Sequence, residues 1–119
     1  MIQTSYFALY RENRGVNIAL FPPKGFKGKS YSKLAPTPNL LKWWKSCEQT
    51  PENAGTYKLR YYKEVLDKLD VNKVGKTLEG YTVLCFESKE KFCHRHLVAE
   101  WLRAGGFECC EYIKGGKNK

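Results

Sequence analysis

Short apolar and aromatic runs alternate with polar segments along this chain, and they predict the order of its strands. Residues 4–9 and 16–21 are two such runs that flank a polar stretch. A third run, residues 81–87, lies between the turn signal at Gly80 and a polar loop, and residues 107–113 form the last one. We therefore expect about four strands.

The spacing of apolar residues predicts helices between the second and third strands. Asn39 is a candidate cap for a short helix, and the side chains expected to face the core are Leu40, Leu41 and Trp44. A second helix is expected to begin at Thr56, with an apolar stripe at Leu59, Tyr62, Leu66 and Leu69. Asp70 is expected to cap another short turn through Leu78.

The last part of the chain has the order strand, helix, strand. Residues 94–103 have helical periodicity, and Gly105 and Gly106 follow in the position of a left-handed cap. A βαβ unit of this length has a right-handed crossover and parallel strands. The prediction is a small single α/β domain over residues 1–113, with a mostly parallel sheet of about four strands flanked by helices. The basic, Gly-rich tail 114–119 is expected to be frayed.

Residues 22–38 hold four of the five prolines and follow neither a helical nor a strand period, which predicts a long surface loop. Its lysines, Lys24, Lys27, Lys29 and Lys33, are interleaved with Phe26 and Tyr31. This arrangement fits either a basic, aromatic flap for a nucleic acid or nucleotide, or a solvated lysine loop.

The net charge changes the expected class of partner. The chain has 21 Lys and Arg against 12 Asp and Glu, a formal charge of +9. Such an excess favours nucleic acid or small phosphorylated ligands, although it can serve solubility alone. No apolar run has the length of a bilayer span and no secretory pattern opens the chain, so we expect a cytoplasmic protein with no membrane partner.

Five cysteines at irregular spacing argue against a disulfide framework, so free thiols are expected. No Cys-x-x-Cys pair occurs. Cys93, His94 and His96 could supply metal ligands, but their crowding fits no ordinary zinc-finger spacing. We expect no metal and no cofactor.

The candidate site lies between residues 83 and 96. Side chains alternate along a strand, so Cys85 and Glu87 are expected on one face, at the carboxyl end where open α/β sheets bind ligands. The next helix begins just beyond, and its free N–H groups favour an anion. We therefore expect an anion-binding site at this edge.

The first residues of that helix supply the candidate chemistry. A thiol at Cys93, beside His94 and Arg95, is placed where its pKa tends to fall, although a buried Cys can also be a small hydrophobe. Arg95 could hold a phosphate or form an internal ion pair with Glu87. His94 could be a general base or a hydrogen-bonded core imidazole.

Further ligand contacts are expected near the end of the first strand and in the lysine loop. The candidates are Ser5, Tyr6, Arg11, Lys27 and Lys29. Together with Arg95 they complete the predicted ligand-binding set, while Cys93, His94, Glu87 and Cys85 are the candidate catalytic residues.

Several of these segments resemble the domain of unknown function 488 family. The similar segments are Thr4-Ser5-Tyr6-Phe7-Ala8 with Arg11, Val16-Asn17-Ile18-Ala19, Pro22-Pro23 with Leu34-Ala35-Pro36, Leu84-Cys85-Phe86-Glu87, and residues 92–102 with their Cys-His-Arg element. The resemblance spans nearly the whole chain. It implies a compact α/β domain of bacterial or phage type and supports the position of the site, but it implies no reaction.

Three functions fit the sequence. The first is a module that binds a nucleotide or nucleic-acid phosphate at residues 83–87 and 93–96. The second is an enzyme on such a ligand that uses the Cys, His, Glu and Arg side chains. The third is a phage-encoded host-interaction or inhibitor protein. The sequence leaves the oligomeric state and the question of catalysis open.

Overall fold

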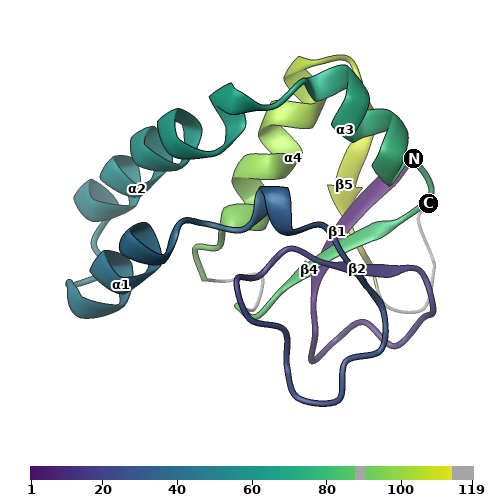
Figure 1. Ribbon diagram of the computed structural model, residues 1–119, viewed down its shortest axis with the longest axis horizontal. Coiled ribbons are helices and arrows are strands. Elements are labelled where there is room, and N and C mark those ends of the chain that lie inside the picture. Colours follow the sequence, from purple (N-terminus) through teal and green to yellow (C-terminus); the bar gives the residue numbers. More distant parts are fainter. Residues whose placement is uncertain (88–90, 114–119) are drawn as a thin grey trace.

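The computed structural model describes residues 1–87 and 91–113, and a parallel sheet organises them (Figure 1). Its five strands are β1 (Ile2–Tyr6), β2 (Gly15–Asn17), β3 (Lys29–Ser30), β4 (Thr82–Cys85) and β5 (Cys109–Glu111). Their order is β3-β2-β4-β1-β5, and all four pairings are parallel. The predicted α/β class is confirmed. The predicted tail, 114–119, lies outside the described residues.

The sequence pattern missed β3, which lies inside the predicted loop 22–38. Both of its residues, Lys29 and Ser30, are exposed and polar, so neither contributes an apolar signal. Backbone pairing of Val16 with Lys29 and of Asn17 with Ser30 places this strand at the sheet edge. An edge strand of this kind depends on backbone hydrogen bonds rather than on burial.

The other strands are shorter than their apolar runs. The run at 4–9 leaves the sheet after Tyr6, the run at 16–21 after Asn17, and the run at 81–87 after Cys85. The last strand covers only residues 109–111 of the predicted 107–113. The extra apolar residues belong to loops that pack near the strand ends, where periodicity alone cannot separate strand from buried loop.

The βαβ unit joins β4 to β5 through α4 (His94–Ala104), and its strands are parallel as predicted. β1 lies between the two strands and pairs with both. The helix lies over these three strands and contacts each of them (Figure 1). Gly106 follows the helix with φ of 95°, a left-handed conformation that favours glycine.

The remaining helices are α1 (Pro38–Ser46), α2 (Pro51–Glu64) and α3 (Val71–Leu78), with short 3₁₀ turns at Ser32–Leu34 and Leu66–Lys68. Thr37, rather than the predicted Asn39, caps α1, and its hydroxyl accepts a hydrogen bond from the Leu40 N–H. Thr50, rather than Thr56, caps α2. Asp70 caps α3 as predicted.

The buried face of α2 differs from the predicted apolar stripe. Leu59 was predicted in the apolar stripe but is 75% exposed. Tyr57 and Tyr61 are buried instead, four residues apart on one face of the helix. The Tyr61 hydroxyl donates to the Leu34 carbonyl at 2.6 Å, which satisfies its polar atom inside the protein.

The core lies between the sheet and the helices. Its fully buried apolar side chains include Ile2, Ile18, Leu34, Leu40, Leu66, Val83, Val98 and Leu102. Among the helices of the described residues, none is long and apolar enough to cross a membrane.

Candidate functional site

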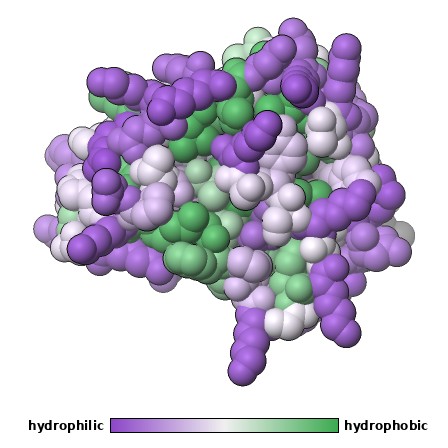
Figure 2. Space-filling model, in the orientation of Figure 1, coloured by the Kyte–Doolittle hydropathy of each residue, from purple (hydrophilic) through white to green (hydrophobic). Residues whose placement is uncertain are grey.

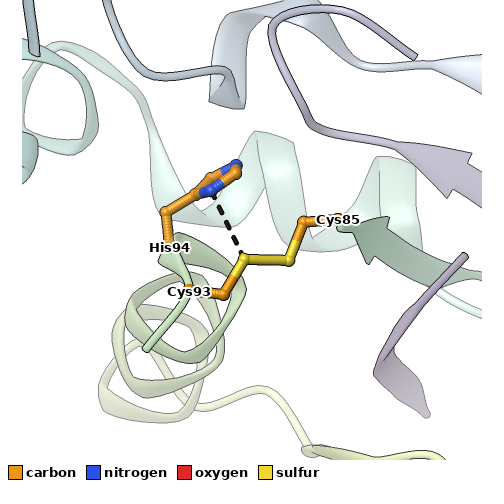
Figure 3. Close-up of side chains that lie close together, drawn as sticks. All are labelled: Cys85, Cys93 and His94. Atoms are coloured by element: carbon orange, nitrogen blue, oxygen red, sulfur yellow. Dashed lines mark hydrogen bonds between the residues drawn. A yellow bond between two sulfur atoms is a disulfide. The ribbon is translucent and has the colours of Figure 1, made fainter. Parts of the chain in front are cut away.

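The candidate site forms where β1 and β4 end and α4 begins. The register pairs Tyr6 with Cys85, so the two strands end side by side. Cys93 is the extended residue that precedes the helix, and His94 is its first residue. The topology therefore brings Cys85, Cys93 and His94 together, as the close-up in Figure 3 shows.

Cys85 and Cys93 are joined by a disulfide (Figure 3). The expectation of free thiols is wrong for this pair, while Cys47, Cys109 and Cys110 are free. The odd number of cysteines did not exclude this bond, because one pair can form beside three free thiols. The pair forms because the strand end and the helix start meet at the same edge of the sheet.

His94 is buried and held in one tautomer by the backbone. Its Nε2 lies 2.8 Å from the carbonyl oxygen of Ile18. A carbonyl only accepts, so Nε2 carries the hydrogen and Nδ1 of the neutral ring keeps a lone pair. That lone pair faces the Cys93 sulfur, with Nδ1 3.8 Å from Sγ (Figure 3).

Burial also determines the charge of this ring. Desolvation, together with a smaller effect of the positive charge of Arg95, lowers the pKa of His94 to about 4, against the opposing effect of the hydrogen bond to the Ile18 carbonyl. The imidazole is therefore neutral near neutral pH. Its Nδ1 lone pair is a hydrogen-bond acceptor that faces the Cys93 sulfur.

Arg95 is fully buried, with 0% of its surface exposed, and its guanidinium is occupied by protein groups. It forms a bidentate pair with Glu111 through Nη2 at 2.9 Å and Nε at 3.3 Å. Nη1 donates to the Cys85 sulfur at 3.1 Å and to the Glu87 carbonyl oxygen. Its contacts therefore connect β4, β5 and α4.

The ionic partner of Arg95 is thus Glu111, not Glu87. The alternation expected to bring Glu87 onto the Cys85 face stops because β4 ends at Cys85. Glu87 is exposed and lines the rim of a cavity. Sequence reasoning missed Glu111, whose position next to Arg95 follows from the pairing of β5 with β1.

A cavity of about 340 Å³ opens above the sulfur atoms. Its wall is largely apolar and includes the aromatic residues Trp44, Tyr57 and Phe92, while Cys85, Cys93 and His94 line the same space. Trp44 and Phe92 have ring centroids 5.1 Å apart. We call this space the sulfur cavity. Aromatic walls with a few polar groups are typical of sites for planar organic ligands.

The other predicted ligand residues are spread around the sheet. Ser5 is fully buried, and its Oγ has no hydrogen-bond partner. The Tyr6 ring lies under the guanidinium of Arg95, 5.4 Å from Cζ to the ring centroid. Arg11 and Lys27 are exposed and line a second hollow, whereas Lys29 donates to the Tyr81 hydroxyl at 3.1 Å. The structure therefore does not gather these residues around one ligand position.

The sulfur cavity also contains the only donor set for a metal among residues 1–87 and 91–113. The ligand atoms of Cys85, Cys93 and His94 lie within 4.8 Å of one another. Two sulfurs bonded to each other are poor ligands, so this set would need reduction before it could hold a soft cation such as Zn²⁺. That the protein uses no metal stays a prediction.

Comparison with known proteins identifies the family of this chain. The family model DUF488-N3a, described as "Active DUF488-N3 subclade", matches residues 4–106. The chain belongs to this DUF488 subclade. The match includes residues 4–6 of β1, the cysteine of β4 and the Cys-His-Arg element at the start of α4, so the predicted family is confirmed. Searches of curated proteins and of solved structures find no significant match.

Proposed function

We propose that this DUF488-N3a protein is an enzyme that acts on a nucleotide or a nucleic acid through the thiol of Cys93. The observation that carries the proposal is the pairing of the Cys93 sulfur with Nδ1 of a neutral, backbone-oriented His94. Covalent catalysis uses a nucleophile next to a base, with a third group that orients the base. The description of the subclade as active agrees with this proposal and names no reaction.

The reactive form is the dithiol. A thiol reductant gives two electrons and two protons to the Cys85–Cys93 bond and is itself oxidised to a disulfide. Cys93 is then the nucleophile beside His94. Cys85, which receives a hydrogen bond from Arg95, is the second thiol and reforms the disulfide when the site is oxidised.

The chemistry has two balanced steps. The Cys93 sulfur attacks an electrophilic carbon of the ligand while its proton moves to Nδ1 of His94, and the leaving group departs with that proton. Water then attacks the same carbon, His94 takes a proton from the water, and the sulfur regains a proton as the product leaves. Glu87, at the rim of the cavity, is a further proton carrier.

The dimensions and lining of the sulfur cavity support a planar ring as the reacting group. Trp44, Tyr57 and Phe92 offer faces and edges for stacking, and the cavity volume of about 340 Å³ is of the size that small organic ligands occupy. The net charge of +9 supports a ligand that also carries phosphate.

A binding module without chemistry is the second candidate. Arg11 and Lys27 favour it, because both are exposed and neither forms an ion pair within the described parts of the chain. Arg95, by contrast, has its donors engaged by Glu111, Cys85 and Glu87. In either function we assign it to positioning the strand and helix ends.

Turnover of nucleotides by the reduced protein separates the two candidates. The test incubates wild type, Cys93→Ser and Cys110→Ser with nucleoside monophosphates and a mixed-sequence oligonucleotide, and detects products by mass spectrometry. We expect Cys93→Ser to bind these ligands but to lose turnover, and Cys110→Ser, altered at a free thiol outside the site, to keep it. Turnover that survives in Cys93→Ser, or binding without turnover in reduced wild type, would contradict the enzyme proposal.

A further inference from the structure

A second, wider hollow of about 820 Å³ adjoins the sulfur cavity. The segment after β1 and the loop between β2 and β3 form its walls, and Leu84 of β4 lies at its base. Phe86 lines both spaces, so they meet at this side chain. We call the second space the basic hollow.

Four aromatic side chains line the basic hollow, and three of them, Phe7, Phe26 and Phe86, pack together. Phe7 is the central one, with ring centroids 5.3 Å from Phe26 and 5.0 Å from Phe86. Phe86 is 52% exposed, so its ring is accessible to a ligand. Exposed rings on which bases can stack are typical of proteins that bind single-stranded nucleic acid.

Cations surround these rings. Arg11, Lys24 and Lys27 line the hollow, are exposed, and form no hydrogen bond or ion pair with the described residues. The acidic residue in the lining, Glu12, accepts a hydrogen bond from the Tyr112 hydroxyl at 3.4 Å. The charge of the hollow is therefore complementary to phosphate.

On the face in Figure 2, hydrophobic residues gather between the α1 end of the molecule and the loop that projects below the sheet. Hydrophilic side chains surround this patch and extend from the projecting loop (Figure 2). An apolar cavity beside a charged rim suits a ligand with alternating rings and phosphates.

We propose that the basic hollow binds the backbone of a single-stranded nucleic acid, so that one base passes Phe86 into the sulfur cavity. This inference rests on the proposed function and names its substrate class. A base in a duplex is stacked and paired, and cannot enter a cavity of this kind without being flipped out. Three cations beside three rings provide for more than one nucleotide, which favours a strand over a mononucleotide.

Binding to labelled homopolymers tests the proposal without requiring turnover. Fluorescence anisotropy measures the affinity of the reduced Cys93→Ser protein for oligothymidylate and oligouridylate of about 12 nucleotides. We expect Phe86→Ala to weaken binding about tenfold, through lost stacking of one base. Lys24→Gln with Lys27→Gln should lower the slope of log affinity against log salt by about 1.4, or about 0.7 for each lost phosphate contact.

A matched pair of lysines provides the control. Lys63 of α2 and Lys73 of α3 are exposed and do not line the hollow, so changing both to Gln removes the same charge elsewhere. An equal loss of affinity in this control would overturn the proposal, as would equal affinity for duplex DNA. Displacement of the oligomer by thymidine monophosphate, added at the same total concentration of nucleotides, would identify a mononucleotide site and overturn the proposal.

Protection of the thiols tests whether a base reaches the sulfur cavity. Saturating oligothymidylate should slow alkylation of Cys93 in reduced wild type and leave Cys110 unchanged. Binding without protection of Cys93 would overturn base entry. If binding and protection occur but turnover persists in Cys93→Ser, the proposed catalytic role of Cys93 fails and the substrate class stands. If turnover depends on Cys93 but is unchanged by the substitutions at Phe86, Lys24 and Lys27, the catalytic role of Cys93 stands and the proposed substrate class fails.

Discussion

Arg95 carries a positive charge inside the protein and depends on Glu111 to balance it. The pair is bidentate, and Glu111 also accepts a hydrogen bond from the Thr4 hydroxyl at 2.6 Å. Removing one partner of a buried ion pair leaves the other charge desolvated, which is strongly destabilising. The same guanidinium contacts Cys85, so the stability of the fold and the order of the site are linked through one side chain.

We predict that Glu111→Gln lowers the free energy of unfolding by about 2–3 kcal/mol, below the usual cost for a fully buried pair because Glu111 is partly exposed. Gln still accepts from Thr4, so the change tests the charge. Urea unfolding measures it, with Glu108→Gln as the control, since Glu108 is exposed. If Glu111→Gln unfolds at the same midpoint urea concentration as wild type, the pair adds no stability.

His94 makes stability depend on pH in a defined window. Burial lowers its pKa to about 4, against about 6.5 in an unfolded chain. Between these values the unfolded state binds a proton that the folded state does not, so stability falls as the pH drops through the window. The difference corresponds to on the order of 3 kcal/mol, present in full above about pH 6.5.

We predict that the free energy of unfolding of wild type falls more steeply between pH 7 and pH 4 than that of His94→Gln. The Gln amide can keep the hydrogen bond to Ile18 but does not titrate. Other groups act in both proteins, including Glu64, whose pKa is lowered mainly by the Thr37 hydroxyl. Chemical unfolding across this range compares the slopes, and equal slopes would contradict a buried, neutral His94.

At the scale of elements, the disulfide fastens the end of β4 to the start of α4. It closes a short loop of sequence separation 8. A cross-link of this size restricts the unfolded chain and contributes about 2–3 kcal/mol in the chain-entropy description. Reduction should therefore loosen the junction at which the candidate nucleophile lies.

We predict that a dithiol reductant lowers the free energy of unfolding of wild type by about 2–3 kcal/mol. Cys85→Ser, which cannot form the bond, should show no response to the reductant, and this makes it the control. Parallel urea titrations with and without reductant provide the measurement. A response of the same size in Cys85→Ser would assign the effect to another group.

The sequence predicted the existence of the long helices better than their ends. Thr37-Pro38 and Thr50-Pro51 each place a cap before a proline, which is the usual start of a helix, yet apolar spacing favoured Asn39 and Thr56. The stripe predicted for this helix included Leu59, which is exposed, whereas Tyr57 and Tyr61 are the buried residues. β3 could not be predicted from periodicity, because both of its side chains are exposed.

At the scale of the whole molecule, sequence reasoning identified the region of the candidate site but not its long-range partners. Cys85 and Cys93 were expected near one sheet edge because a βαβ unit brings a strand end to a helix start. Glu111 and the Ile18 carbonyl reach Arg95 and His94 through the strand order β2-β4-β1-β5. That order depends on the packing of distant segments, and no local pattern encodes it.

In the proposed function, Cys93 is a nucleophile activated by His94. Site-resolved alkylation by iodoacetamide, in reduced protein treated with a chelator at neutral pH, tests it most directly. Cys109 is an internal reference for a slow thiol, since burial raises its pKa to about 11. We predict that Cys93 reacts faster than Cys109 and half-exposed Cys110, and that His94→Gln slows Cys93 alone by about tenfold or more. A Cys93 that reacts as slowly as Cys109, or at the same rate in His94→Gln, would contradict the activation of Cys93 by His94.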